Sequence, residues 1–351
     1  MIGKITSPGL FRLFLALMVF VHHTTQFSVG TSAVYIFFCL SGFWIQKMWT
    51  GRYSATRQPY FTYMVSRLWR LLPTFWLVTL LTLLVVRLNG STESYWSGSS
   101  RAHLLISNLL IVGYYGLRRM LITPAWSLDM EMQFYVVAPI IAIILARRKV
   151  NFIWLLAAAA VISAASSILH SPIPPLNFIV YFVIGMVAAS TNWHPSGKMA
   201  LVFLGATVVL VAGCVVTPLH GVLFVGAHPG PLAVYTPYAN IAIAVLMIPY
   251  AIFTTAQKGP AIDGMFADLS YIIYLLHWAG TTWINAHPGT LAQRLHYLAV
   301  GWALVIGSSL IIWKIYDHPI NRMRSQWVSS RKKTVAVRPR IAEEARTETA
   351  T

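Results

Sequence analysis

Apolar segments long enough to cross a lipid bilayer recur along almost the whole chain of 351 residues. A membrane-spanning helix needs about 20 predominantly apolar residues, and such runs follow one another from Leu10 to Trp313 with no gap that could hold a soluble domain. Only 10% of the residues are charged, against about 25% in an ordinary soluble domain. The sequence therefore predicts an all-α, polytopic integral membrane bundle, with residues 1–328 as one domain and 329–351 as a disordered cytoplasmic tail.

Basic residues cluster after particular apolar runs, and this pattern predicts which loops face the cytoplasm. They follow the second run, recur at 147–149, and extend from Lys314 to Lys333. Because cytoplasmic loops are enriched in Lys and Arg, we expect both termini in the cytoplasm, segment 104–122 to be re-entrant, and a location in the cytoplasmic membrane. About ten spans satisfy this rule: 10–28, 33–50, 71–88, 127–146, 151–169, 176–191, 199–217, 233–255, 269–286 and 296–315.

The net charge of +17 could suggest a nucleic-acid partner. The basic residues fall mostly between apolar segments, however, where they act as topology signals and contact anionic lipids. Cys39 and Cys214 lie inside apolar runs and offer neither a disulfide framework nor a metal-ligand spacing. We therefore expect membrane lipids as partners, and neither nucleic acid nor a bound metal.

The first span contains an arginine and a histidine that share one helical face. Arg12 and His23 are eleven positions apart, which leaves them about 20° from eclipsed and roughly 16 Å apart along a helix. A charged side chain kept at bilayer depth usually faces the bundle interior or a watery cavity, so this pair is a candidate functional pair. Alternatively, Arg12 reaches the cytoplasmic headgroups and His23 is a structural residue near the outer interface.

The next two spans add small and basic residues. Ser41 and Gly42 are expected to interrupt an aromatic-rich helix, where small residues let another backbone approach closely. Arg67 and Arg70 lie one turn apart, just before Pro73, which is expected to open the third span. Two guanidinium groups at a cytoplasmic mouth can bind phosphates, although ordinary positive-inside charges explain them as well.

The stretch "PAWSLDMEMQFYVVAPI" at 124–140 carries two acids at the expected start of a span. Asp129 and Glu131 lie in or near the first turn, where the helix dipole favours acids. An acid that enters a membrane helix usually has a partner, and Arg12 or His23 are the expected partners.

A polar stripe occurs near the C-terminus, within "SYIIYLLHW". Ser270, Tyr274 and His277 lie on one helical face, and this stripe is expected to point inward. Beyond it, Asp317 precedes Pro319 and is expected to be a structural salt-bridge partner rather than a catalyst.

These motifs, in this order, resemble the acyltransferase 3 family of polytopic membrane O-acyltransferases, and the resemblance covers essentially the whole membrane domain. The family pattern of Arg, ten residues and His matches Arg12 and His23. The sequence departs from many relatives at Met132, where they carry a second acid, and at Asp317, where they carry Glu. The other matching motifs are "FFxLSGF" at 37–43, the Arg-x-x-Arg pair at 67–70, "WSLxxExQFY" at 126–135 and "SYxxYLLHW" at 270–278.

The resemblance implies transfer of an acetyl or other short acyl group from acyl-CoA to a hydroxyl of a surface saccharide or glycolipid. Arg12 would hold the donor, and His23 would act as general base or as an acyl-accepting nucleophile. Glu131 would be the essential acid. The remaining implied site residues are Arg67 and Arg70 for the donor phosphates, and Ser41, Trp126, Asp129, Tyr274 and His277 as support.

The tetrahedral oxyanion would need hydrogen-bond donors. Backbone amides near Ser41 or Gly42, or the Trp126 indole, are the candidates. Acyl-CoA is then a donor substrate and no cofactor is bound permanently. Two other functions remain open for a polar-lined helical bundle: a transporter or flippase for a lipid-linked saccharide, and a membrane scaffold whose histidines are structural.

Overall fold

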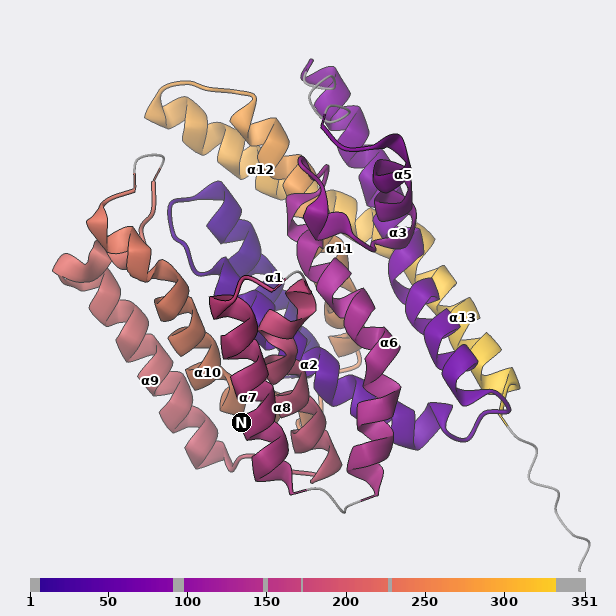
Figure 1. Cartoon of the computed structure of the whole chain (residues 1–351). Coiled ribbons are helices and arrows are strands. Elements are labelled where there is room, and N and C mark those ends of the chain that lie inside the picture. The colour runs from indigo at the N-terminus through magenta and orange to yellow at the C-terminus, as the bar shows by residue number, and fades with distance from the viewer. Residues whose placement is uncertain (1–6, 91–97, 148–150, 172, 227–228, 333–351) are drawn as a thin grey trace, which may run out of the picture.

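The computed structural model describes residues 7–90, 98–147, 151–171, 173–226 and 229–332. Every segment predicted to span the membrane forms a helix (Figure 1). Part of the predicted tail, 333–351, lies outside the described residues. The helices are α1 (Pro8–Thr24), α2 (Gly30–Met48), α3 (Pro59–Leu88), α6 (Trp126–Ala146), α7 (Phe152–Ile168), α8 (Ile179–Ser190), α9 (Gly197–Val216), α10 (Thr236–Thr255), α11 (Asp263–Asn285) and α12 (Leu291–Ile312).

Within the described residues, five helical stretches are long and apolar enough to cross a bilayer. They are Pro59–Leu88, Thr123–Ala146, Gly197–Val216, Pro231–Thr255 and Leu291–Ser330. Shorter apolar helices cover Pro8–Thr24, Phe152–Ile168 and Pro174–Ser190. Together with the exposed apolar faces described next, these stretches define a multi-pass helical membrane protein.

The outer helices present apolar side chains to their surroundings rather than to the core. On α9, Val202, Val209 and Val216 are exposed and recur every seven residues, so they lie on one face of the helix. A soluble protein rarely exposes such a contiguous apolar surface, whereas hydrocarbon is a good solvent for it.

Helix α3 corrects one sequence prediction. It runs without interruption from Pro59 to Leu88, with Pro73 in its interior, so Pro73 does not open the span. Arg67 and Arg70 consequently lie inside the helix and not in a cytoplasmic loop. The carbonyl of Pro73 accepts a hydrogen bond from the Tyr316 hydroxyl at 3.2 Å, which ties this part of α3 to the C-terminal end of the bundle.

The segment expected to be re-entrant contains only one short helix, α5 (Arg101–Leu110). Ten residues of helix rise about 15 Å, half of the hydrocarbon thickness of about 30 Å. Ile111 adopts a left-handed conformation and ends α5, and 3₁₀ turns at Tyr114–Gly116 and Thr123–Ala125 then lead into α6. No helix in the described part of 104–122 is long enough to span, as the re-entrant interpretation requires.

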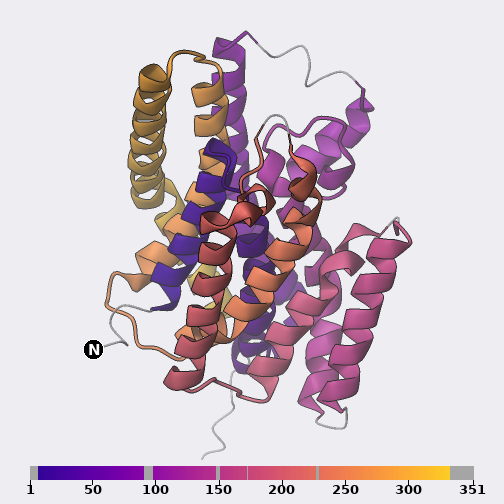
Figure 2. The same ribbon diagram turned by 90° about the vertical axis from the view of Figure 1, so that its left-hand side faces the viewer.

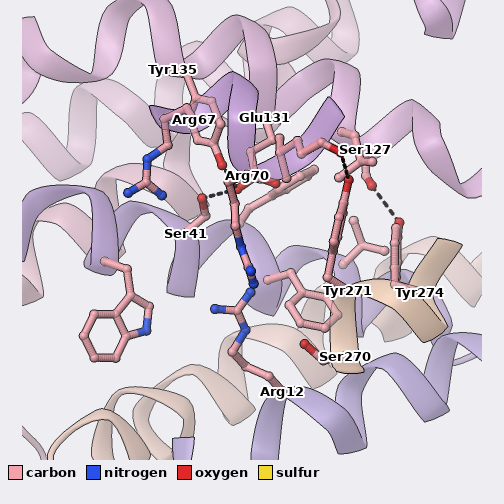
Figure 3. A pocket seen from close by; sticks show the side chains of 16 residues that line it. Arg12, Ser41, Arg67, Arg70, Ser127, Glu131, Tyr135, Ser270, Tyr271 and Tyr274 are labelled. Atoms are coloured by element: carbon pink, nitrogen blue, oxygen red, sulfur yellow. Dashed lines mark hydrogen bonds between the residues drawn. The ribbon is translucent and has the colours of Figure 1, made fainter. Parts of the chain in front are cut away.

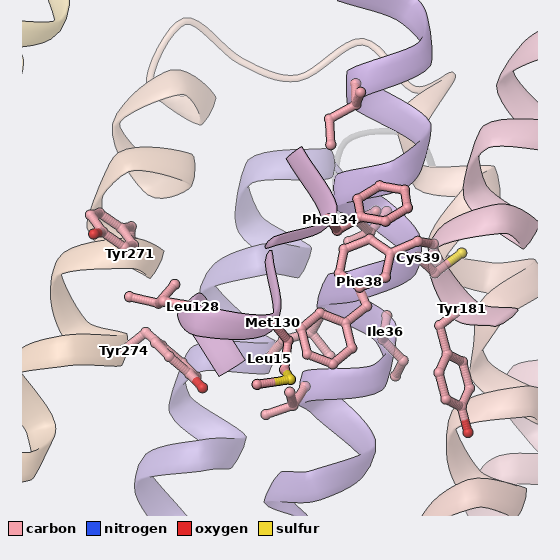
Figure 4. Packing of buried hydrophobic residues seen from close by; sticks show 14 of the residues in the cluster. Leu15, Ile36, Phe38, Cys39, Leu128, Met130, Phe134, Tyr181, Tyr271 and Tyr274 are labelled. Carbon is pink, nitrogen blue, oxygen red and sulfur yellow. The ribbon is translucent and has the colours of Figure 1, made fainter. Parts of the chain in front are cut away.

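Helices α1, α2, α10 and α11 form the centre of the bundle. α1 packs against both α11 and α2, and α10 packs between α2 and α9. In the view turned by 90°, α9 and α10 stand in front of α1 and α2 (Figure 2). The core between α2, α6 and α8 is aromatic: Phe134 stacks on Phe182 at 4.0 Å, and Phe38 stacks on the same ring at 4.7 Å (Figure 4).

Two glycines allow the backbones of α2 and α8 to touch. A Cβ atom at Gly42 would lie 2.0 Å from the carbonyl oxygen of Phe182, and one at Gly185 would lie 1.8 Å from that of Cys39. The expectation that small residues admit a neighbouring backbone here is confirmed. The expected interruption is wrong, because α2 is continuous through Ser41 and Gly42.

The N-terminus of α1 is capped by an acid from a distant part of the sequence. Asp263, the first residue of α11, accepts hydrogen bonds from the backbone amides of Gly9 and Leu10, each at 3.0 Å, and from the Ser7 hydroxyl. Its negative charge also complements the positive end of the helix dipole. This contact fixes the depth of α1, and therefore of Arg12, relative to α11.

The C-terminal end of the bundle continues beyond α12. A π-helical turn at Trp313–Asp317 leads into α13 (His318–Ser330). Lys332 forms an isolated β-bridge with Thr56, so residues 329–332 pack against the α2–α3 connection and the structured region extends past the predicted boundary at 328.

Candidate active site

A cavity of about 110 Å³ lies among α1, α2, α3, α6 and α11 (Figure 3). Arg12 enters it from one side and Arg70 from the other, with Glu131 above them in this view. The cavity thus contains charges deep in an apolar bundle, where an unpaired charge is costly. Its polar lining comprises Arg12, Ser41, Arg67, Arg70, Ser127, Glu131, Tyr135, Ser270, Tyr271 and Tyr274.

Arg70 is held by acids from two other helical segments. Its Nη1 atom lies 2.9 Å from Oδ1 of Asp268 and 4.0 Å from Oδ2 of Asp317. Asp317 also accepts hydrogen bonds from Thr74, at 2.7 Å, and Asn321, at 2.7 Å. The expectation that Asp317 is a structural salt-bridge partner is confirmed, although its partner could not be identified from the sequence.

Arg67 lies in a cage of tyrosines. Its guanidinium carbon is 5.6 to 5.8 Å from the ring centres of Tyr53, Tyr63 and Tyr135, within the range of cation–π attraction. Nη2 also donates to the Tyr53 hydroxyl at 3.0 Å. The cage fixes the arginine without neutralising its positive charge, so the charge remains available to an anion in the cavity.

Arg12 differs from the other two arginines because its side chain has neither an ion pair nor a hydrogen bond within the described residues, whereas Arg70 pairs with acids and Arg67 donates to Tyr53. Its Nε atom is buried and has no hydrogen-bond partner. An unsatisfied buried donor on a charged group carries a desolvation cost. Arg12 is therefore the group in this cavity best prepared to gain from an incoming anion.

Glu131 points into the cavity and accepts two hydrogen bonds there. The Tyr135 hydroxyl donates to its Oε1 atom at 2.7 Å, and the Ser41 hydroxyl donates to the same atom (Figure 3). Glu131 shares the cavity with Arg12 but forms no direct ion pair with it among the described residues. Sequence reasoning placed both residues at the site and did not anticipate that Tyr135 connects Glu131 to the aromatic cage of Arg67.

Asp129 has a different environment, and its expected partnership with Arg12 or His23 is wrong. Its carboxylate accepts hydrogen bonds from the backbone amides of Gly113, at 3.1 Å, and Tyr115, at 2.9 Å, and from the Gln133 side chain at 2.7 Å. It is buried and does not line the cavity. Asp129 therefore holds the loop that follows α5 against α6.

The predicted polar stripe on α11 faces the cavity only in part. Ser270 and Tyr274 line it, and the Tyr274 hydroxyl is 2.6 Å from that of Ser127 and donates to the Pro124 carbonyl at 3.0 Å. His277, the next residue of the stripe, is fully buried outside this lining. Tyr271, which sequence reasoning missed, also lines the cavity and donates to the Leu71 carbonyl at 2.8 Å.

His23 lies away from the arginine cavity, among other aromatic rings. Its ring stacks on that of His277 with 5.4 Å between centres, and Trp278 packs edge-on at 5.2 Å. His277 Nδ1 lies 3.1 Å from the Ile273 carbonyl, while its Nε2 is buried without a partner. Arg12 and His23, which match the Arg and His of the family pattern, therefore lie in two separate regions along α1. Arg12 lies in the cavity, and His23 lies in a histidine cluster with His22 and His277.

The expected oxyanion donors on α2 are not available. Residues 41 and 42 lie inside a continuous helix, where the backbone amides are used in helical hydrogen bonds. Trp126 packs on Phe178 at 5.5 Å and outside the cavity lining. The hydroxyls that line the cavity belong to serines and tyrosines, and the helical spacing predicted this orientation for Ser270 and Tyr274.

The fold is a multi-pass helical membrane bundle with an internal cavity that three arginines line. The chain belongs to the acyltransferase 3 family: a family model described as an acyltransferase domain matches residues 5–313. One curated relative is the acyltransferase MdmB of Streptomyces mycarofaciens, which is 25% identical over 390 aligned positions covering 93% of each chain. No solved structure matches the chain. The protein is therefore an acyltransferase, as its motifs predicted.

Proposed function

We propose that this protein is a multi-pass membrane O-acyltransferase. In this proposal it moves an acetyl or other short acyl group from acyl-CoA to a hydroxyl of a surface saccharide or glycolipid. The observation that carries the proposal is the convergence of Arg12, Arg67 and Arg70 on one cavity inside a bundle that belongs to an acyltransferase family. Coenzyme A is a phosphate-rich anion, and guanidinium groups are well suited to bind phosphate.

The donor would enter from the cytoplasm. Arg67 and Arg70 are held in place by the tyrosine cage and by two acids, so they would need little reorganisation to bind it. The Arg12 side chain has neither an ion pair nor a hydrogen bond in the described region and would gain the most from the donor. The separation of Arg12 and His23, roughly 16 Å along the helix, is comparable to the reach of a pantetheine arm, so the thioester would arrive near His23.

His23 would serve as the general base. Its neutral imidazole takes the proton from an acceptor hydroxyl as the hydroxyl oxygen attacks the thioester carbonyl carbon. The tetrahedral intermediate then collapses, the carbon–sulfur bond breaks, and the imidazolium returns the proton to the leaving CoA thiolate. General acid–base catalysis of this kind contributes on the order of 10²- to 10⁴-fold. Glu131 would position Ser41 and Tyr135 and balance the charge of the arginines.

The proposed orientation has ten spans in the cytoplasmic membrane, with both termini in the cytoplasm. It follows from the distribution of basic loops. It places the start of α1 and the arginine cavity toward the cytoplasmic side, and the histidine cluster toward the opposite side. The donor and acceptor would therefore approach the reaction centre from opposite sides of the membrane.

The decisive experiment measures acyl transfer from labelled acetyl-CoA in membranes containing the wild type, His23→Asn or His22→Asn at equal protein levels. Surface glycans and glycolipids are then analysed by mass spectrometry. We expect the wild type and His22→Asn to add the acyl group, and His23→Asn to lose about 10²-fold or more of the activity. Transfer that survives in His23→Asn would remove His23 from the chemistry.

The same preparation distinguishes direct transfer from a covalent acyl-histidine. Direct transfer in a ternary complex gives sequential kinetics. An acyl-histidine intermediate gives ping-pong kinetics and label trapped on the protein in the absence of acceptor. If no acyl-CoA is consumed with any acceptor, and movement of a lipid-linked saccharide across the membrane continues without the donor, the transporter interpretation replaces this proposal.

A further inference from the structure

A second cavity, of about 580 Å³, lies between α3 and α5 and shares no lining residue with the arginine cavity. Helix α3 and the segment after α5 form one wall, and α5 forms the other. The complete lining is Thr79, Leu83, Arg101, Leu104, Leu105, Asn108, Arg119 and Leu121. None of these residues is among the site residues predicted from the sequence, and the proposed acyl transfer uses none of them.

The cavity borders the lipid-facing surface. Leu105, Ile106 and Leu109 on α5 are exposed apolar side chains, and α3 exposes Leu80 and Leu84 on its adjoining stretch. A cluster of exposed apolar side chains on a membrane protein is best solvated by hydrocarbon. A cavity that combines this position with a leucine lining is suited to an acyl chain.

Two arginines give the cavity a positive charge. Arg101 and Arg119 both line it, and neither forms an ion pair within the described residues. Arg101 is also the first residue of α5, where unpaired backbone amides and the helix dipole add to the attraction for an anion. Anionic ligands would therefore be preferred over neutral ones.

Two polar atoms between the arginines and the leucines have no partner. Thr79 Oγ1 and Asn108 Oδ1 are buried without a hydrogen bond, although Asn108 Nδ2 donates to the Leu104 carbonyl at 2.9 Å. Each unsatisfied buried group costs about 1–3 kcal/mol. A ligand with a hydroxyl and an ester next to its phosphate could satisfy both atoms, because the hydroxyl would donate to Asn108 Oδ1 and the ester carbonyl would accept from the Thr79 hydroxyl.

We propose that the α3–α5 cavity binds one anionic membrane glycerophospholipid, with its phosphate on Arg101 and Arg119 and an acyl chain along Leu83, Leu104 and Leu105. An ester carbonyl then lies beside the Thr79 hydroxyl, and a headgroup hydroxyl lies beside Asn108 Oδ1. The chemistry of the lining requires a phosphate joined to an apolar chain, which a glycerophospholipid supplies and a free phosphate ion does not. This site is independent of the proposed acyl transfer.

The test is native mass spectrometry of the full-length protein, delipidated in detergent and titrated with dioleoyl phosphatidylglycerol or dioleoyl phosphatidylcholine. We expect one retained phosphatidylglycerol and weaker retention of phosphatidylcholine. Each arginine near a membrane surface contributes about 1 kcal/mol, so Arg101→Gln with Arg119→Gln should weaken binding roughly 20- to 30-fold. Arg87→Gln, which removes an exposed arginine of α3 outside the cavity, is the matched control.

A second variant tests the acyl-chain part of the site. Leu83→Trp fills the cavity and should reduce phosphatidylglycerol binding while leaving both arginines in place. If one variant fails to fold, photocrosslinking of the wild type with a diazirine-tailed phosphatidylglycerol should label α3 or α5. Equal retention of both lipids, equal loss in Arg87→Gln, or displacement of the lipid by inorganic phosphate at the same concentration would each overturn the proposal.

Discussion

At the residue scale, two acids within the first six residues of α6 have different roles. The Asp129 carboxylate accepts hydrogen bonds from backbone amides of the preceding loop, whereas the Glu131 carboxylate faces the cavity and accepts hydrogen bonds from side-chain hydroxyls. They are separated by two positions, about 200° around a helix, so they necessarily point in nearly opposite directions. A charge count cannot distinguish them, but the direction of each side chain does.

Asp129→Asn should therefore lower mainly the stability of the protein, and Glu131→Gln should lower mainly its acyl-transfer activity. Asp129→Asn weakens charge-assisted hydrogen bonds worth about 1.5–3 kcal/mol each, so we expect a lower unfolding temperature in detergent, measured by tryptophan fluorescence. Glu131→Gln keeps the shape and should retain most of that stability while lowering acyl transfer. A stable Asp129→Asn protein with lost activity would contradict this assignment.

Arg12 leads to a second prediction at this scale. Because its guanidinium has no ion pair in the described region, Arg12→Gln should not break an internal contact and should leave stability nearly unchanged. We expect the KM for acyl-CoA to rise about tenfold or more, since hydrogen bonds to charged groups contribute about 1.5–3 kcal/mol. Arg12→Lys should recover part of the loss, and an unchanged KM would exclude Arg12 from donor binding.

At the element scale, the bundle depends on close backbone approach and on one long-range cap. Gly42 and Gly185 allow α2 and α8 to meet along the segment that carries Ser41 into the cavity. Asp263 joins the N-terminus of α1 to α11 and sets the depth of Arg12. The helix contact and the cap both position cavity residues, although Gly42, Gly185 and Asp263 do not line the cavity themselves.

Gly42→Ala should destabilise the protein by about 1–3 kcal/mol, because the added methyl group would overlap the Phe182 carbonyl and force the helices apart. Gly205→Ala on α9 is the control, since no atom lies within 4 Å of the added carbon. The control should be neutral or up to about 1 kcal/mol more stable. Thermal unfolding of the two variants in the same detergent makes the comparison; equal stability would show that α2 and α8 can separate freely.

At the scale of the whole molecule, the proposed orientation can be tested directly by cysteine accessibility. The native Cys39 and Cys214 are buried and can both be replaced by alanine. In that background, a membrane-impermeant maleimide should label Ala286→Cys, between α11 and α12, in intact cells. It should label Ser330→Cys, at the end of α13, only after the inner membrane is opened. The reverse pattern would invert the proposed orientation.

The sequence by itself determined the helical membrane class, the positions of the apolar helices and the family. These properties depend on the local recurrence of apolar residues and on motifs that are short and ordered along the chain. It also singled out Arg12, Glu131, Ser41 and Tyr274, which line the cavity, because a polar group inside a membrane helix is costly enough to indicate function or a specific partner.

Only the tertiary structure decided which polar groups meet. The partners of Arg70 come from positions 268 and 317, the cap of α1 comes from position 263, and His23 lies with His277 rather than with Arg12 in the cavity. Helical periodicity fixes the direction of a side chain around its own axis but not which helix lies opposite. That choice depends on packing between helices, including the close contact that Gly42 and Gly185 permit.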